Sequence, residues 1–115
     1  MRSEENIYAT DDPVRNDPHN YKTLLENDRV RVMEYRSQPG EKSALHSHPD
    51  CVVYSFGPGT LLITAPSGIS EEFELKTGAL MWRHETTHAL QNIGSTEAHL
   101  LVVELKSPEE PIPMG

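Results

Sequence analysis

Residues 40–59 read G-E-K-S-A-L-H-S-H-P-D-C-V-V-Y-S-F-G-P-G, and this stretch decides both the fold and the chemistry expected of the chain. His46 and His48 lie two positions apart, so in an extended strand their side chains leave the same face. A second stretch, residues 78–92, reads G-A-L-M-W-R-H-E-T-T-H-A-L-Q-N and carries His84 and His88. Imidazole is a common metal ligand near neutral pH, so two histidine pairs in one short chain indicate a metal site.

Strand-length segments separated by Gly, Pro or Asn surround these two stretches. Their spacing is about ten residues, and no long segment keeps a helical period, which together are typical of an all-β sandwich or barrel. The predicted strands are 29–36, 52–56, 61–65, 72–75, 80–83, 88–92 and 98–106.

Length and composition predict one domain with polar ends. The chain has 115 residues, and two segments, 1–20 and 107–115, are polar and interrupted by proline. We expect an extended N-terminal arm over 1–20, a β-barrel over 21–106 and a Pro-rich tail over 107–115. The arm is also placed to exchange between two chains, so a homodimer is expected.

Charge limits the expected partners, and cysteine content and the N-terminal sequence indicate the cellular compartment. A net charge of −8 without a basic cluster repels phosphate backbones and anionic lipid, so neither nucleic acid nor membrane is an expected partner. The single cysteine, Cys51, rules out an internal disulfide framework, and the acidic N-terminus lacks the apolar run of a secretory signal. A cytoplasmic protein is expected.

The segment 84–88, H-E-T-T-H, also matches the H-E-x-x-H pattern of zinc proteases, in which both histidines lie on one helix face. Adjacent β-branched Thr86 and Thr87 and the flanking Gly78 and Gly94 argue against that helix. In a β-structure, a third ligand for the first histidine pair must come from a strand distant in sequence and adjacent in space. His88 suits that role.

The spacing of both stretches resembles that of the cupin family. The first family motif, G-x5-H-x-H-x3-4-E-x6-G, matches residues 40–59, and the second, G-x5-P-x-G-x2-H-x3-N, matches residues 78–92 with one residue fewer before the histidine. The resemblance implies a cupin-type jelly-roll β-barrel with His46, His48 and His88 as ligands of one divalent transition metal. Iron, zinc, nickel and manganese all suit imidazole ligands.

The departures from the family pattern matter for function. Val52 stands where the first motif has its glutamate ligand, and His84 and Thr86 replace the proline and glycine of the second motif. Three neutral histidines would leave the ion its full charge and an open position, although Val52 is also compatible with a lost metal site. Glu34 and Glu104 are carboxylates within apolar strands, and either could replace the missing ligand or face outward.

Further candidates lie close to the motifs in the sequence. Tyr54 has the same strand parity as Val52, so we expect it to point inward as a hydrogen-bond donor or acid. His84 is a candidate pocket acid or base, a fourth ligand or a rim residue. Arg83 could bind a carboxylate substrate.

Two functions therefore remain open. The first is a metal-dependent enzyme acting on a small oxygenated or carboxylate molecule, by dioxygenase chemistry or as a Lewis-acid isomerase or dehydratase with Tyr54 and His84 as catalytic residues. The second is a non-catalytic module that binds or senses a small ligand, with or without metal.

Overall fold

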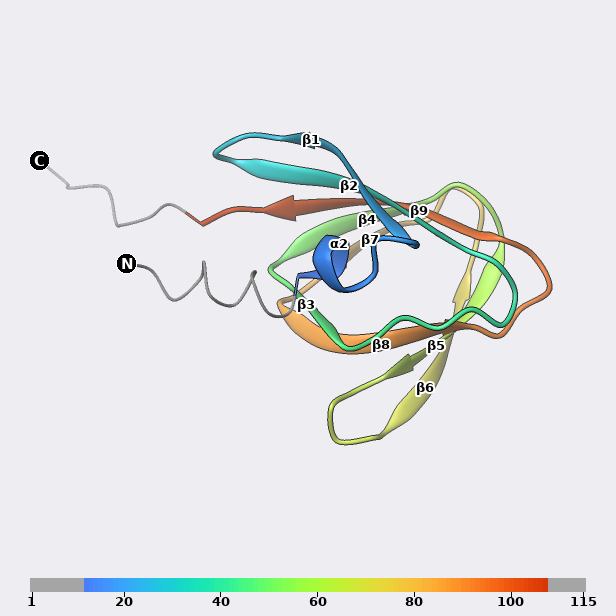
Figure 1. Ribbon diagram of the computed structural model, residues 1–115. Helices are drawn as coiled ribbons and strands as arrows, with labels where there is room; N and C mark the ends of the chain where they lie inside the picture. The colour runs from blue at the N-terminus through green and yellow to red at the C-terminus, as the bar shows by residue number, and fades with distance from the viewer. Residues whose placement is uncertain (1–11, 108–115) are drawn as a thin grey trace, which may run out of the picture.

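Two facing β-sheets and the loops that join their strands make up nearly all of residues 12–107, the part of the chain that this computed structural model describes (Figure 1). One sheet has five strands in the order β1-β2-β9-β4-β7, and the other has four in the order β3-β8-β5-β6. The bounds are β1 Tyr21–Glu26, β2 Val30–Ser37, β3 His46–His48, β4 Cys51–Ser55, β5 Gly59–Thr64, β6 Ser70–Leu75, β7 Leu80–Arg83, β8 Thr86–Asn92 and β9 Ala98–Leu105. This antiparallel arrangement confirms the all-β jelly roll, although the two sheets are not joined into a closed barrel.

The seven predicted strands all exist, with ends that agree to within two residues. Strand β1 was not predicted. Its sequence, Y-K-T-L-L-E, does not alternate between apolar and polar residues, and its pairing with β2 shifts register between Thr23 and Leu25. The irregular register explains why the period-two signal is absent there.

Residues 12–20 differ from the extended arm expected over this part of the chain. Pro13–Asn16 form the short helix α2, and the side chain of Asp12 caps it by accepting a hydrogen bond from the Arg15 amide at 3.1 Å. Proline begins this helix instead of breaking it, because the first helical position needs no amide donor. Helix α2 contacts β1 of one sheet and β3 of the other, so it lies across one end of the space between them (Figure 1). The rest of the expected arm and nearly all of the tail lie outside the described residues.

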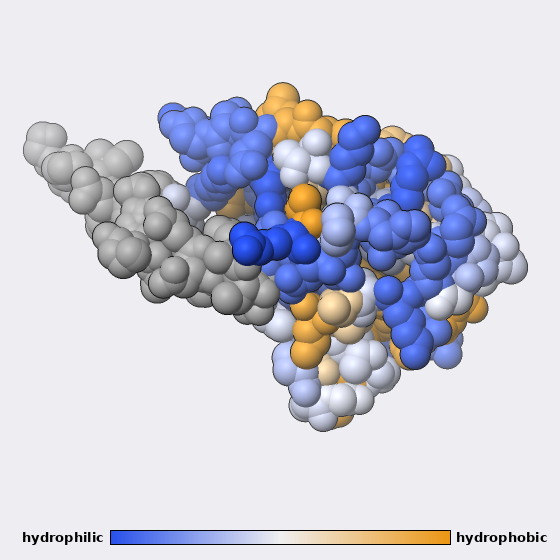
Figure 2. Space-filling model, viewed as in Figure 1, coloured by the Kyte–Doolittle hydropathy of each residue, from blue (hydrophilic) through white to orange (hydrophobic). Residues whose placement is uncertain are grey.

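The interior between the sheets is filled mainly by apolar side chains. Its buried members are Tyr21, Met33, Tyr35, Cys51, Val53, Leu61, Leu75, Leu90, Ala98, Leu100 and Val102. Polar residues cover most of the face shown in Figure 2. Within residues 12–107, no helix has the length and apolar character that spanning a membrane would need.

Candidate metal centre

Strands β3 and β8 bring three histidines together inside the jelly roll. His46 and His48 leave the interior face of β3, and the strand register places His88 of β8 directly opposite His46. All three are buried, with exposed fractions of 0%, 5% and 8% respectively. Each offers one ligand atom, and these atoms lie within 4.8 Å of one another. The convergence predicted from the sequence is confirmed.

His48 is held by a buried chain of charged groups. Its Nδ1 donates to Oε2 of Glu104 at 2.6 Å, and Oε1 of Glu104 accepts from Nε of Arg31 at 3.0 Å. Arg31 in turn forms an ion pair with Asp12, just before helix α2. Because a carboxylate only accepts, it fixes the tautomer of His48 and leaves the Nε2 lone pair for a metal.

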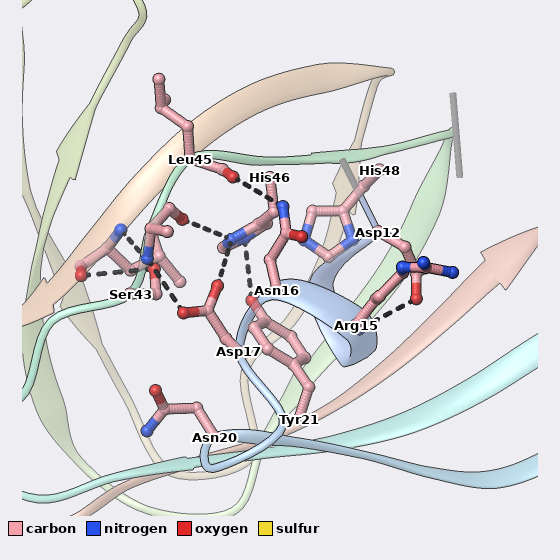
Figure 3. A network of polar contacts seen from close by, with 12 residues as sticks. Asp12, Arg15, Asn16, Asp17, Asn20, Tyr21, Ser43, Leu45, His46 and His48 are labelled. Atoms are coloured by element: carbon pink, nitrogen blue, oxygen red, sulfur yellow. Dashed lines mark hydrogen bonds and ion pairs between the residues drawn. The ribbon is translucent and has the colours of Figure 1, made fainter. Parts of the chain in front are cut away.

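His46 is held by the segment that follows α2 (Figure 3). Its Nδ1 donates to the carbonyl of Ala44 at 3.0 Å and lies 3.4 Å from Oδ2 of Asp17. Its Nε2 then accepts a hydrogen bond from the hydroxyl of Tyr21 at 3.1 Å. Burial, reinforced by the neighbouring His48, lowers the pKa of His46 to about 4, so His46 is neutral at pH 7.

His88 differs from both. Neither of its ring nitrogens has a hydrogen-bond partner among residues 12–107, although both are buried. Burial is the main cause that lowers its pKa to about 2, with His48, His46 and Arg83 adding to the effect. A buried imidazole without a partner costs free energy, and a metal ion in the cluster would supply that partner. Three such imidazoles fit the ligand preferences of divalent zinc, iron or nickel.

A cavity of about 60 Å³ lies beside His48 and His88. Its walls are mostly apolar. The other polar side chains that reach it are those of Tyr21, Cys51, Arg83 and Thr86. Burial raises the pKa of the Cys51 thiol to about 11, so the thiol stays protonated at neutral pH and is a poor metal ligand there.

Comparison with solved structures identifies the family. The crystal structure of a cupin domain from Bordetella pertussis Tohama I is 32% identical to this chain, with a TM-score of 0.70, and the match covers 76% of this chain and 92% of that one. The chain belongs to the cupin family.

Other solved structures share the fold at lower identity. An RmlC-like cupin with a double-stranded β-helix fold from Methanocaldococcus jannaschii is 17% identical with a TM-score of 0.60, and covers 75% of this chain and 78% of its own. A conserved protein with a double-stranded β-helix domain from Klebsiella pneumoniae is 23% identical with a TM-score of 0.59, covering 91% of this chain and 89% of its own. No family model and no curated protein matches the chain.

No carboxylate joins the histidine cluster of this cupin within residues 12–107. Val52, aligned with the family's glutamate, lies between two residues that line the cavity, Cys51 and Val53, and does not line it itself. Glu34 does not replace the glutamate either, because it binds Nε2 of His99 at 2.6 Å, away from the cluster. Glu104 holds His48 from the side opposite the ligand nitrogen.

The structure places both predicted catalytic residues outside the cavity. The buried residues of β4 are Cys51, Val53 and Ser55, so Tyr54 faces away from the interior. On that outer side its ring contacts Phe56. The expectation that Val52 and Tyr54 point inward was therefore wrong by one residue. His84 lies in the exposed connection between β7 and β8 and accepts from Nε1 of Trp82 at 3.4 Å, so it reaches neither the cavity nor the cluster.

The hydroxyl that does lie at the cluster is that of Tyr21, which could not be predicted from the sequence because β1 lacks a strand pattern. Burial raises the pKa of Tyr21 well above its usual value, so its phenol stays protonated. The inward direction of Glu104 could be predicted in part, because it follows the apolar Leu100 and Val102 at alternate positions, on one face of β9. A carboxylate on an inward-facing position needs a partner.

Proposed function

We propose that this cupin is a three-histidine metalloenzyme that acts on a small oxygenated molecule in the cavity beside His48 and His88. The observation that carries the proposal is the convergence of three buried histidines, one of which, His88, has no other hydrogen-bond partner in residues 12–107. Such a donor set, shielded from bulk water by apolar walls, is typical of catalytic metal sites.

The residues of the chain have separate tasks in this proposal. His46, His48 and His88 would hold the ion, and Glu104 keeps the ring of His48 in the orientation and tautomer that binding needs. A divalent ion bound there supplies Lewis-acid polarisation or, as Fe(II), oxidative chemistry. The hydroxyl of Tyr21, 3.1 Å from Nε2 of His46, is a protonated donor for a developing negative charge on the substrate.

Metal content tests the proposal directly. Purified protein loaded with Fe, Zn, Ni or Mn is expected to retain close to one ion per chain after desalting, as measured by elemental analysis. His46→Ala should retain almost none, whereas His84→Ala, a matched change in the exposed connection, should retain the full amount. Wild-type protein that cannot be loaded with any of the four metals would overturn the proposal.

The reaction class requires a second measurement. Oxygen uptake by iron-loaded protein, assayed against thiols, diketones and phenols, distinguishes dioxygenase chemistry from isomerisation or dehydration. The alternative function, a ligand-binding or sensor cupin, is favoured by the small and mostly apolar cavity. It predicts ligand binding without turnover in every such assay.

A cytoplasmic homodimer without nucleic-acid or membrane partners is part of the proposal and rests on the charge and end segments of the sequence. The exposed apolar side chains of Leu80 and Trp82 on β7, which are 70% and 48% exposed, are consistent with self-association. Light scattering coupled to size-exclusion chromatography should give twice the chain mass. A monomer mass would end this part of the proposal.

A further inference from the structure

Among residues 12–107, Arg83 is the one arginine that lines the cavity beside the histidine cluster. Strand β7 alternates, so that Leu80 and Trp82 are exposed while Met81 and Arg83 line the cavity. The guanidinium therefore lies at the interior side of the sheet. It is close enough to His88 and Cys51 for its charge to add to the lowering of the pKa of His88 and to oppose, in part, the rise that burial causes in the pKa of Cys51.

The guanidinium of Arg83 has no hydrogen bond or ion pair with any other residue in the described range 12–107. The other arginines on the five-stranded sheet differ: Arg31 binds Asp12 and Glu104, and Arg36 binds Glu34 and Glu97. A half-buried guanidinium against apolar walls gains most from an anion that enters with a complementary fork of oxygens.

The rest of the cavity restricts what that anion can be. Its apolar walls include Val53, Met81 and Leu90, and among residues 12–107 no second arginine and no lysine lines it. A phosphate would leave some of its four oxygens without a donor against these apolar walls, whereas the two oxygens of a carboxylate match one guanidinium in charge and geometry. A volume of about 60 Å³ admits only a short hydrocarbon chain.

We propose that Arg83 binds the carboxylate of a short aliphatic acid, places its hydrocarbon part against Val53, Met81 and Leu90, and so selects the substrate class of this site. The catalytic part of this inference rests on the proposed metal function, but the binding of the acid by Arg83 does not. An oxygen on the carbon next to the carboxylate would then lie toward the histidine cluster, as in a 2-hydroxy acid.

The test compares one acid with its uncharged amide. Binding of 2-hydroxybutyrate and of 2-hydroxybutyramide is measured by calorimetry on metal-loaded protein and again on metal-free protein. Wild type should bind the acid more tightly than the amide. Arg83→Gln should lose about tenfold to a hundredfold in affinity for the acid and almost none for the amide. Arg29→Gln, the same change at an exposed position, should behave as wild type.

Each result decides the matter. Acid preference that survives in Arg83→Gln overturns the proposal, and so does a metal-loaded wild type that binds acid and amide equally; in both cases the metal function stands. If no metal binds at all, the metal function fails, and the metal-free titrations still decide the role of Arg83. If Arg83→Gln does not fold, Arg83→Lys keeps the charge without the planar fork and should weaken acid binding several-fold relative to the amide, and an unchanged ratio would count against the proposal.

Discussion

The two strands that supply the histidine cluster support their ligands in opposite ways. On β3, His48 is held through Glu104 and Arg31, and His46 through Ala44 and Asp17. On β8, His88 has only its backbone position opposite His46 and no side-chain partner in residues 12–107. The two histidines of β3 are therefore oriented by the fold itself, whereas a bound metal ion would give His88 the partner that its side chain lacks.

The two arrangements have different effects on stability and on metal affinity. A network of hydrogen bonds orients a histidine and stabilises the metal-free fold. An unpartnered buried imidazole destabilises that fold, and metal binding would remove this cost. Changes to the β3 network should therefore alter both stability and affinity. Changes to His88 should lower affinity without lowering stability at pH 7.

The largest expected effect is on stability as a function of pH. The pKa values of His46 and His88 are about 4 and about 2 in the folded protein, below the ordinary value of 6.5. As the pH falls below 6.5, the unfolded chain takes up protons that the folded chain does not, so the free energy of unfolding decreases. Between pH 7 and pH 5, denaturant unfolding of metal-free protein should show a loss of about 2 kcal/mol from each histidine.

A control variant isolates one of the two contributions. His88→Leu removes one titrating group, so its free energy of unfolding should fall by about 2 kcal/mol less over the same pH range. An identical slope in wild type and variant would mean that His88 is not held neutral by burial.

The next effect compares two substitutions in the metal-free protein at pH 7. His48→Leu leaves Oε2 of the buried Glu104 without its donor, and should lower the free energy of unfolding by about 3 kcal/mol. His88→Leu breaks no hydrogen bond and should leave stability unchanged or raise it. Urea unfolding curves measure both values, and equal losses in the two variants would contradict the asymmetry described above.

A smaller effect is expected on metal affinity. Glu104→Gln keeps the size of the side chain but removes the charge that orients His48, and should weaken metal binding about tenfold to a hundredfold. Competition with a coloured chelator measures the change. Glu34→Gln is a matched control, because Glu34 and Glu104 each bind a histidine at 2.6 Å and only Glu104 does so at the cluster. Equal losses in both variants would rule out a specific role for Glu104.

The smallest effect has the opposite sign. Nε2 of His46 cannot accept from Tyr21 and bind a metal at once, so metal binding must break that hydrogen bond. Tyr21→Phe should therefore strengthen metal binding, by up to about tenfold. Tyr35→Phe, which removes a buried hydroxyl bonded to Ser37, should leave metal binding unchanged. Weaker binding in Tyr21→Phe would show instead that the phenol is itself a ligand.

The histidine cluster could be predicted from the sequence because the geometry of its first two members is local. Residues two apart in a strand always share a face, so His46 and His48 needed only the assignment of an extended segment. His88 required a pairing between distant strands, which the resemblance to cupins supplied and the register confirms.

Tyr54 and Tyr21 show what the sequence could not provide. The run C-V-V-Y-S in β4 has no clear alternation of apolar and polar residues. Because the extended segment is interrupted between β3 and β4, the inward and outward positions of β4 could not be counted on from His48. The sequence-based assignment was therefore off by one residue, and it placed Tyr54 inside. Tyr21 and Asp17 reach the cluster only because residues 12–20 fold back across the end of the sheets. That contact depends on tertiary structure alone.

Strand β3 has only three residues and forms the edge of its sheet, paired to β8 through His46–His88, Ser47–Thr87 and His48–Thr86. A slip of one residue would place Thr87 where His88 now faces the interior. An ion held by both strands would therefore stabilise the observed register over the shifted ones, in which His88 no longer faces the interior. In this cupin, metal loading would also fix the alignment of its shortest strand.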